Sequence, residues 1–260
     1  AVMPAHVVYP QVDAQPADAW IDEWDSFYIE IWTTVEDDQF GVHTVSTDLV
    51  YNKDLFTATA IEYGSAIRDN RSGTIDTASG RIDAIGGSTR VFTIDHYTGE
   101  AGDTYPSYDP EDLHLFGDGA PVLVARVYFE PNLAGPGVPL DVQGKYPQPI
   151  TDLGFAFENA QVKWSSVDAT NVTLRGLQNA QLWPVIYDID DQGSVGLGDL
   201  SFFAAAYRHN VGDPGITWAW ASDFDHNGKV DLGDLSYFAA NYRRVGGDGT
   251  PTVYPANFPN

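Results

Sequence analysis

The first two thirds of the chain contain short runs in which apolar and polar residues alternate, a pattern typical of β-strands. In residues 27–35 (FYIEIWTTV), every second residue from Tyr28 to Thr34 falls on one side of the predicted strand. Turn-forming clusters at residues 69–73 (DNRSG) and 132–137 (NLAGPG) separate such runs. Several short strands without a long helical period predict an antiparallel β-sandwich. The predicted strands cover residues 27–35, 55–63, 90–95, 122–129, 155–164 and 171–174.

Beyond residue 186 the pattern changes to two loop–helix units. In each expected helix, apolar residues recur at i, i+3, i+4 and i+7, so two short helices can share one small core. These stripes are Leu200, Phe203, Ala204 and Tyr207 in the first helix, and Leu235, Phe238, Ala239 and Tyr242 in the second. We expect the sandwich over residues 1–178, a short linker over 179–186, the helical module over 187–244 and a Gly/Pro-rich tail over 245–260.

For the tail, two interpretations stay open. A segment rich in Gly and Pro without periodicity is typical of a disordered terminus. Alternatively, Tyr254 and Pro255 of the tail meet Trp183 and Pro184 of the linker and clasp the two ends of the module.

The helical module is an internal duplication that begins with two acidic loops of 12 residues. They are residues 188–199 (DIDDQGSVGLGD) and residues 223–234 (DFDHNGKVDLGD), which start 35 residues apart, and similar helices (LSFFAAAYR and LSYFAANYR) follow. Calcium binds roughly 6–8 oxygens, and a 12-residue loop supplies them from positions 1, 3, 5, 7, 9 and 12. Position 6 is Gly because the chain turns sharply there. Both loops fit this spacing, so we expect two calcium ions.

Each loop therefore has an expected set of ligands. In the first loop they are Asp188, Asp190, Gln192, the Ser194 carbonyl and Asp199, with Gly193 at the turn. In the second loop they are Asp223, Asp225, Asn227, the Lys229 carbonyl, Asp231 and Asp234, with Gly228 at the turn. Because Gly196 replaces an acid at position 9, we expect the first loop to bind calcium more weakly. At position 8, Val230 is expected to form the short β-contact through which paired loops meet.

The alternative to metal binding is an acidic turn that caps a helix. Asp199 and Asp234 lie at expected helix N-termini, where carboxylates are favourable in any case. Capping does not explain the acids at positions 1 and 3 or the glycine at position 6, and the two loops share all of these features.

Composition narrows the function further. Acidic residues outnumber basic ones by 37 to 13, and the net charge of −24 disfavours binding to nucleic acid or anionic membrane. No stretch approaches the roughly 18 apolar residues of a membrane span. The absence of Cys excludes disulfides, thiolate metal sites and Cys nucleophiles. Metalloprotease, nucleophile-elbow and P-loop motifs do not occur, so we expect no enzyme.

The duplicated loops resemble dockerins, the calcium modules that dock onto cohesin domains in cellulosome-type assemblies. The closing Asp and the D-L-S-x-F-A-A-x-Y continuation carry this resemblance over residues 187–244. It implies a cohesin-type partner that contacts loop positions 10 and 11 and the helix beyond. The implied face is Leu197, Gly198, Phe202, Ala205, Ala206 and His209, with Leu232, Gly233, Tyr237, Ala240, Asn241 and Arg244 in the second copy.

Two features of this implied face modify the picture. Leu-Gly replaces the family's frequent Ser/Thr pair at positions 10 and 11, which points to a more apolar contact. Because the copies are alike, either one could face the partner after a half-turn rotation. Phe202 and Tyr237 lie off the apolar stripes, so they face the partner or contact the rest of this chain.

The N-terminal region resembles a cohesin or a related carbohydrate-binding sandwich of the jelly-roll kind. Residues 40–56, in which a strand precedes Tyr51-Asn-x-x-Leu55, and residues 122–129 carry this resemblance. We favour a non-catalytic assembly protein with two interaction modules, secreted or at the cell surface, where calcium is plentiful. A dockerin-borne module that binds polysaccharide through Trp20, Trp24 or Trp32 stays open. So does a polysaccharide-degrading hydrolase.

Overall fold

The computed structural model describes residues 2–8, 20–33, 44–88, 122–133, 149–164, 167–168 and 181–258. Within these ranges the strands are β1 (Val2–Val8), β2 (Trp20–Asp22), β3 (Phe27–Thr33), β4 (Thr44–Val50), β5 (Phe56–Tyr63), β6 (Asp69–Asp76), β7 (Arg81–Ser88), β8 (Val122–Pro131), β9 (Ala156–Trp164), β10 (Val167–Asp168) and β11 (Gln181–Trp183). The helices are α2 (Leu197–Ala206), α3 (Ala219–Ser222) and α4 (Leu232–Asn241). The strands predicted at residues 90–95 and 171–174 lie outside the described residues.

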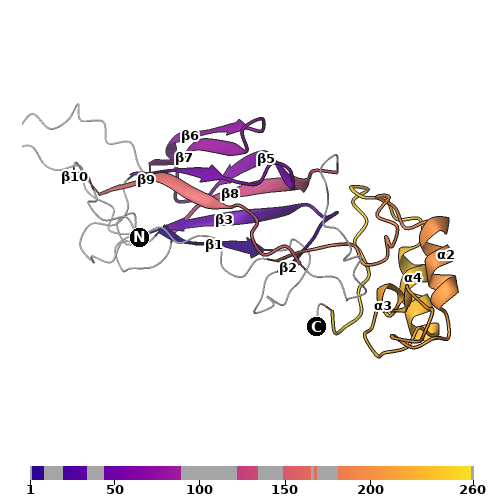
Figure 1. Ribbon diagram of the computed structural model, residues 1–260. Helices are drawn as coiled ribbons and strands as arrows, with labels where there is room; N and C mark the ends of the chain where they lie inside the picture. Colours follow the sequence, from indigo (N-terminus) through magenta and orange to yellow (C-terminus); the bar gives the residue numbers. More distant parts are fainter. Residues whose placement is uncertain are drawn as a thin grey trace, which may run out of the picture.

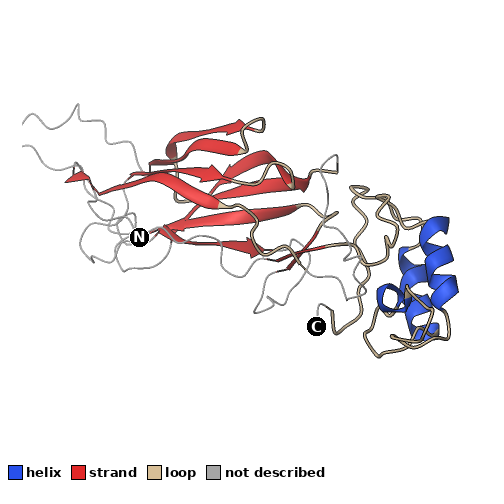
Figure 2. Ribbon diagram, in the orientation of Figure 1, coloured by secondary structure: helices blue, strands red, loops and turns tan. Residues whose placement is uncertain are grey.

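Two antiparallel sheets pack against each other and form a mainly β sandwich (Figure 1). One sheet has the order β1-β3-β8-β5 and the other the order β10-β9-β4-β7-β6. One apolar cluster joins them, with Ile29 and Val127 from the first sheet and Leu49 and Ile82 from the second. Figure 2 shows the helices gathered beyond one end of these sheets.

The alternation of apolar residues explains strand β3. Phe27, Ile29 and Ile31 are almost fully buried in the sandwich core, whereas Tyr28 and Trp32 lie on the partly exposed outer face. Each buried apolar side chain contributes roughly 1.5–3 kcal/mol relative to exposure. The strands predicted from this pattern are confirmed at β3, β5, β8 and β9, with ends that differ by one or two residues.

The turn predicted at residues 69–73 is wrong, because these residues begin strand β6. β6 lies at the edge of its sheet and most of its side chains are exposed, so a polar composition is compatible with a strand there. The turn follows β6, where the Asp76 carboxylate accepts hydrogen bonds from the amides of Ala78 at 3.1 Å and Ser79 at 3.3 Å.

The Tyr51-Asn-x-x-Leu55 segment is a turn that joins β4 to β5. Tyr51 is buried beside Phe129, with ring centroids 5.2 Å apart, and Leu55 is also buried. The Asn52 carbonyl accepts a hydrogen bond from the Leu55 amide at 3.1 Å, and the Asn52 side chain accepts one from the Asp54 amide at 3.0 Å. These residues therefore anchor one end of the sandwich.

The helical module packs around a second apolar core. Phe203 of α2 stacks on Phe238 of α4, with ring centroids 5.6 Å apart. The expected stripe is wrong at its third position, because Ala204 and Ala239 are exposed. Ala206 is fully buried instead, so the packed face of α2 follows the i, i+3 row of the helix. No helix in the described part of the chain is long and apolar enough to span a membrane.

The segments that flank the module join it to the sandwich. Residues 179–186, expected as a linker, contain β11, which pairs in parallel with β2. The tail returns toward this strand, and the Phe258 ring contacts Trp183 at 5.1 Å and Tyr254 at 4.3 Å between centroids. The clasp, and not disorder, therefore describes residues 245–258, with Phe258 as its central ring.

Candidate metal centre and docking face

The first loop gathers the carboxylates of Asp188, Asp190 and Asp199, with oxygens that lie within 4.8 Å of one another. The Asp188 oxygens accept hydrogen bonds from the amides of Gln192 at 3.0 Å and Gly193 at 2.7 Å. Asp199, in the first turn of α2, accepts one from the Asp190 amide across the loop at 3.0 Å. The backbone of the loop thus orients the carboxylates of positions 1 and 12.

The second loop repeats this arrangement with Asp223, Asp225 and Asp234. The Asp223 oxygens accept hydrogen bonds from the amides of Asn227 at 3.1 Å and Gly228 at 2.9 Å. Asp234, in the first turn of α4, accepts one from the Asp225 amide at 3.3 Å. The two loops therefore share one hydrogen-bond network, position by position.

Glycines at two positions make this loop conformation possible. At position 6 the φ angles are +76° and +89° in the two loops, the left-handed region in which Gly has no steric cost. At position 11, glycine is needed because there is little room for a side chain. A Cβ atom on Gly198 would collide with the Asp190 carboxylate, and one on Gly233 would lie 3.3 Å from the Asp225 carboxylate. The Leu-Gly pair thus leaves room for the acid at position 3.

Burial makes these carboxylates costly to ionise. It raises the pKa of Asp188 to about 7, an effect opposed by the loop amides and increased by the charge of Asp199. Burial likewise raises the pKa of Asp234 to about 6, and the Asp225 charge adds to this. Buried like charges call for a cation as their partner.

The chemistry of these residues fits a calcium ion. Every donor is an oxygen, the ligand type that this hard cation prefers. Asp190 Oδ1 is buried and has no hydrogen-bond partner among the described residues, so it retains a lone pair for a metal. The residues that would hold the ions are the two carboxylate clusters, together with the donors expected at the intermediate loop positions.

Those intermediate positions lie at the rim of each loop. Gln192 and Asn227, at position 5, are exposed, and Ser194 and Lys229, at position 7, form isolated β-bridges. Asp231 is the N-cap of α4, where its side chain accepts a hydrogen bond from a backbone amide of the first helical turn at 2.8 Å. The structure thus brings positions 1, 3 and 12 together in both loops. Weaker calcium binding by the first loop stays a prediction.

The expected β-contact between the two loops is wrong. The Val230 amide of the second loop donates to the His209 carbonyl at 2.9 Å, beyond the end of α2. In the first loop, the Val195 amide donates to the Arg244 carbonyl at 2.9 Å and the Val195 carbonyl accepts from the Arg243 amide at 2.9 Å. Each loop therefore pairs with the segment that follows the helix of the other copy.

Part of the implied docking face is accessible. Leu197 and Leu232, the first residues of α2 and α4, are 73% and 68% exposed. Ala205 and Ala240 are exposed farther along the two helices, and the His209 side chain is 43% exposed. The two leucines hold equivalent positions in the two copies, so they are the candidate contact residues of this face.

Other residues of the implied face contact this chain instead. The Phe202 ring packs on Trp218, with centroids 4.7 Å apart, and Tyr237 is half-buried against the module core. Ala206, Asn241 and Arg244 are buried, so the expectation that they meet a partner is corrected.

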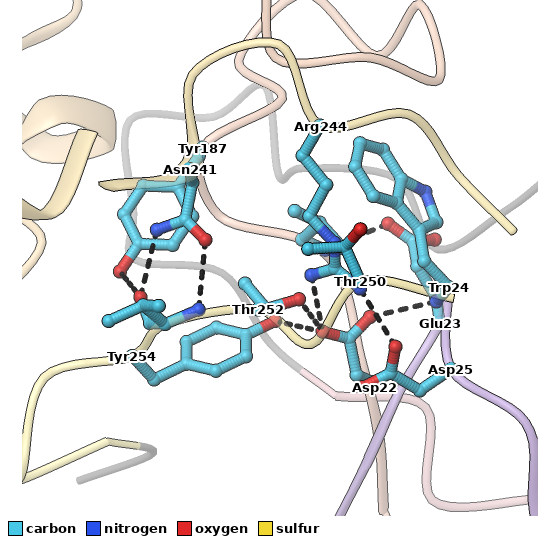
Figure 3. Close-up of polar contacts among 12 residues, drawn as sticks. Asp22, Glu23, Trp24, Asp25, Tyr187, Asn241, Arg244, Thr250, Thr252 and Tyr254 are labelled. Atoms are coloured by element: carbon cyan, nitrogen blue, oxygen red, sulfur yellow. Dashed lines mark hydrogen bonds and ion pairs between the residues drawn. The ribbon is translucent and has the colours of Figure 1, made fainter. Parts of the chain in front are cut away.

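Asn241 binds the tail. Its side chain donates to the Val253 carbonyl at 2.9 Å and accepts from the Val253 amide at 2.8 Å (Figure 3). The Tyr187 hydroxyl donates to the same carbonyl at 2.7 Å. Because the first copy has Ala206 at this place, the tail binds the second copy by contacts that the first copy lacks.

Arg244 and the tail converge on Asp22 of β2, a residue that sequence reasoning missed (Figure 3). Asp22 is 1% exposed and accepts hydrogen bonds from the Trp24 amide at 2.8 Å, from the Tyr254 hydroxyl at 2.9 Å and from the Thr252 hydroxyl. Arg244 Nη1 lies 3.5 Å from the Asp22 carboxylate. A single acidic residue among 37 cannot be singled out from the sequence. The two copies do differ, however, at the equivalent position where the first has His209 and the second has Arg244.

No protein-family model matches this chain. No curated protein matches it either. Among solved structures, it is similar to the third cohesin of ScaC from Acetivibrio cellulolyticus, solved in complex with the ScaB dockerin, at 9% identity and a TM-score of 0.40 over 71% of this chain and 99% of that chain. It is also similar to the seventh ScaB type I cohesin from Pseudobacteroides cellulosolvens, at 10% identity and a TM-score of 0.38 over 70% and 91% of the two chains. A chain of the Clostridium thermocellum Coh-OlpC-Doc435 complex matches at 12% identity and a TM-score of 0.38, over 70% and 92%.

Proposed function

We propose that this chain is a non-catalytic, extracellular assembly protein that docks onto a cohesin-type domain through a calcium-loaded, dockerin-like module. The observation that supports this is the hydrogen-bond network that both loops share. Helix capping accounts for the acids at position 12 of both loops and at position 9 of the second loop. Capping does not require Asp188 and Asp190 to gather beside Asp199. Nor does it require the equivalent acids, Asp223 and Asp225, to gather beside Asp234.

Calcium would neutralise the buried carboxylates and allow each loop to stay folded against its helix. The protein contributes the rest of the site. Loop amides orient the carboxylates of positions 1 and 12, and the position-11 glycine leaves space for the acid at position 3. The first turn of each helix favours the negative charge of Asp199 or Asp234.

The docking face that we propose centres on the two leucines at position 10. Leu197 and Leu232 occupy equivalent places in the two copies and are both largely exposed. Burying one leucine against an apolar partner surface contributes roughly 1.5–3 kcal/mol. This favours a partner contact that is more apolar than one built on Ser and Thr.

We assign the sandwich as a second interaction module, for a dockerin-type partner. Its resemblance to cohesins in residues 40–56 and 122–129 supports this role. A chain with both modules can link one chain to the next.

Calorimetry tests the metal sites. We expect the full chain to bind two calcium ions, and Asp190→Ala and Asp225→Ala to bind one each, because each variant loses a ligand at position 3 of one loop. Asp191→Asn is the matched control, because Asp191 holds the non-ligand position 4 and its left-handed φ of +55° suits Asn. We expect the second loop to fill first. No calcium binding by the full chain would refute the proposed sites.

Docking is tested by calcium-dependent pull-down with a panel of purified cohesin domains. The double variant Leu197→Asp, Leu232→Asp should lose capture by at least roughly tenfold, because two apolar contacts are replaced by charges. Ala60→Asp, which introduces the same charge at an exposed position of β5 in the sandwich, should leave capture unchanged. Equal capture of all variants would contradict the proposed face.

The alternative functions differ in simple readouts. A polysaccharide-binding module would be retained by insoluble glycan, and Trp32, partly exposed on the outer face of β3, is its candidate stacking residue. A polysaccharide-degrading enzyme would release reducing sugar. We expect neither retention nor release.

A further inference from the structure

Arg244 forms a buried contact between the helical module and the sandwich (Figure 3). Its side chain is 4% exposed, Nη2 lies 2.8 Å from Asp25 Oδ1, and Nη1 lies 3.5 Å from Asp22 Oδ2. The guanidinium also lies over the Trp24 ring, 5.4 Å from its centroid. We call Arg244 with Asp22, Trp24 and Asp25 the latch. Asp22 is buried as well, whereas the Asp25 side chain is 25% exposed. Loss of these contacts would leave the buried charge of Arg244 unpaired.

The latch is continuous with the first calcium loop through the backbone. The Arg244 carbonyl accepts a hydrogen bond from the Val195 amide at 2.9 Å, and the Gly246 amide donates to the Gly193 carbonyl at 3.1 Å. Gly193 and Val195 lie inside the loop, between the carboxylates of positions 3 and 12. The backbone on both sides of Arg244 is thus held by the part of the loop that closes around the metal site.

The other end of the first loop meets the same turn of the sandwich. The Val185 amide, three residues before Asp188, donates to the Glu23 carboxylate at 2.8 Å. The Glu23 amide donates in turn to the Trp183 carbonyl at 3.0 Å. Residues 22–25 therefore contact two segments: the one that leads into the first loop, and the one around Arg244 that pairs with this loop. A cavity of about 410 Å³ lies between this loop and the sandwich, lined in part by Trp24, Asp188 and Leu133.

The second loop has a different neighbour. Within this loop, the Val230 amide donates a hydrogen bond to the His209 carbonyl. The Gly228 carbonyl accepts one from the Val211 amide at 3.0 Å. This segment follows α2, and the His209 side chain lies 3.5 Å from Asp213 within the module. Where Arg244 meets the sandwich in the second copy, His209 stays on the module surface in the first.

We propose that the first loop, and not the second, controls how firmly the module is seated on the sandwich: metal binding by Asp188, Asp190 and Asp199 closes the Arg244 latch on Asp22 and Asp25. This inference rests on the proposed calcium sites. With the first site filled, residues 193–195 are fixed and hold the backbone of Arg244 in place. With the site empty, three repelling carboxylates loosen the loop and the segment that pairs with it.

Hydrogen exchange of the full chain tests this proposal, with and without calcium. We expect calcium to slow exchange of the amides of residues 22–25 by roughly tenfold or more, the scale set by one charge-assisted hydrogen bond. Asp190→Ala should abolish this protection, whereas Asp225→Ala, the same change at the same position of the second loop, should retain it. Exchange in β3 and β8 serves as an internal control for the folding of the sandwich.

A second pair of variants separates the latch from the metal. Arg244→Gln should expose residues 22–25 to exchange even with two calcium ions bound, whereas Arg243→Gln, an exposed neighbour of the same type, should not. If calorimetry shows both sites filled but protection at residues 22–25 does not change with calcium, or changes equally in both loop variants, the latch proposal is overturned and the proposed function stands. If no calcium binds, both proposals fail.

Discussion

At the residue scale, Gly198 leaves no room for a side chain beside the carboxylate of Asp190. Its counterpart Gly233 is less crowded, with the nearest oxygens of Asp231 and Asp225 at 3.2 and 3.3 Å from a Cβ position. We therefore expect a side chain at position 11 to disturb the first loop more than the second.

We predict that Gly198→Ala weakens calcium binding by the first loop by about 1–3 kcal/mol, because the added methyl group displaces a ligand. Gly233→Ala is the matched control and should change binding by the second loop far less. Calcium calorimetry on both variants checks this. A larger loss in Gly233→Ala would show that the space at position 11 is not what matters.

Asp25 provides a second prediction at this scale. Burial, and then the charge of Asp22, raise the pKa of Asp25 to about 6, although Arg244 lowers it and Asp248 raises it further. A carboxyl whose pKa is raised on folding destabilises the fold when it is ionised, so its penalty appears as pH rises from 4 through 6. Asp25→Asn removes this penalty and keeps an oxygen that accepts from Arg244.

The variant should therefore melt at a higher temperature than the unchanged chain at pH 7.5 and at nearly the same temperature at pH 3.5, below the ordinary pKa of 3.8. Asp54→Asn, at an exposed turn of the sandwich, controls for the general loss of one negative charge. Thermal melts of the three proteins at both pH values provide the comparison. A destabilised Asp25→Asn at pH 7.5 would mean that its ion pair outweighs the cost of burial.

At the scale of elements, α2 and α4 have 10 residues each, which is marginal for a helix in isolation. Each begins at a loop whose buried carboxylates repel one another. We predict that a chelator lowers the far-UV helix signal and speeds amide exchange in both helices, while exchange in β3, β4 and β8 stays slow. An unchanged helix signal in the calcium-free chain would contradict the coupling of metal to helix.

What the sequence predicts at this scale follows from the range of the interactions. The loops are local, because spacing alone places Asp188, Asp190 and Asp199 around one centre, and the strands with alternation were predicted for the same reason. The edge strand β6 was missed because its polar, exposed residues carry no alternation. The contact of Arg244 with Asp22 joins positions 222 residues apart, and no local pattern encodes it.

At the scale of the whole molecule, the boundary between the two cores does not follow the boundary expected from the sequence. Trp24 precedes β3 of the sandwich, but it is buried in the core of the helical module, together with Val185 and Ile186. Ile21, three residues earlier, belongs to the core of the sandwich. One turn of the chain therefore contributes to both cores and couples them.

We predict that Trp24→Ala destabilises the module and not the sandwich, although the residue comes from the N-terminal region. Removing a buried Trp costs about 3–5 kcal/mol, and Arg244 loses the ring over which it lies. Trp32→Ala, on the partly exposed outer face of β3, is the matched control and should affect the sandwich mildly. Calorimetric melting in saturating calcium, with exchange measured separately in α4 and in β8, resolves the two responses. Because Trp24 packs with the module, its loss should speed exchange in α4 first; a loss of protection that begins in β8 would show that the turn belongs to the sandwich alone.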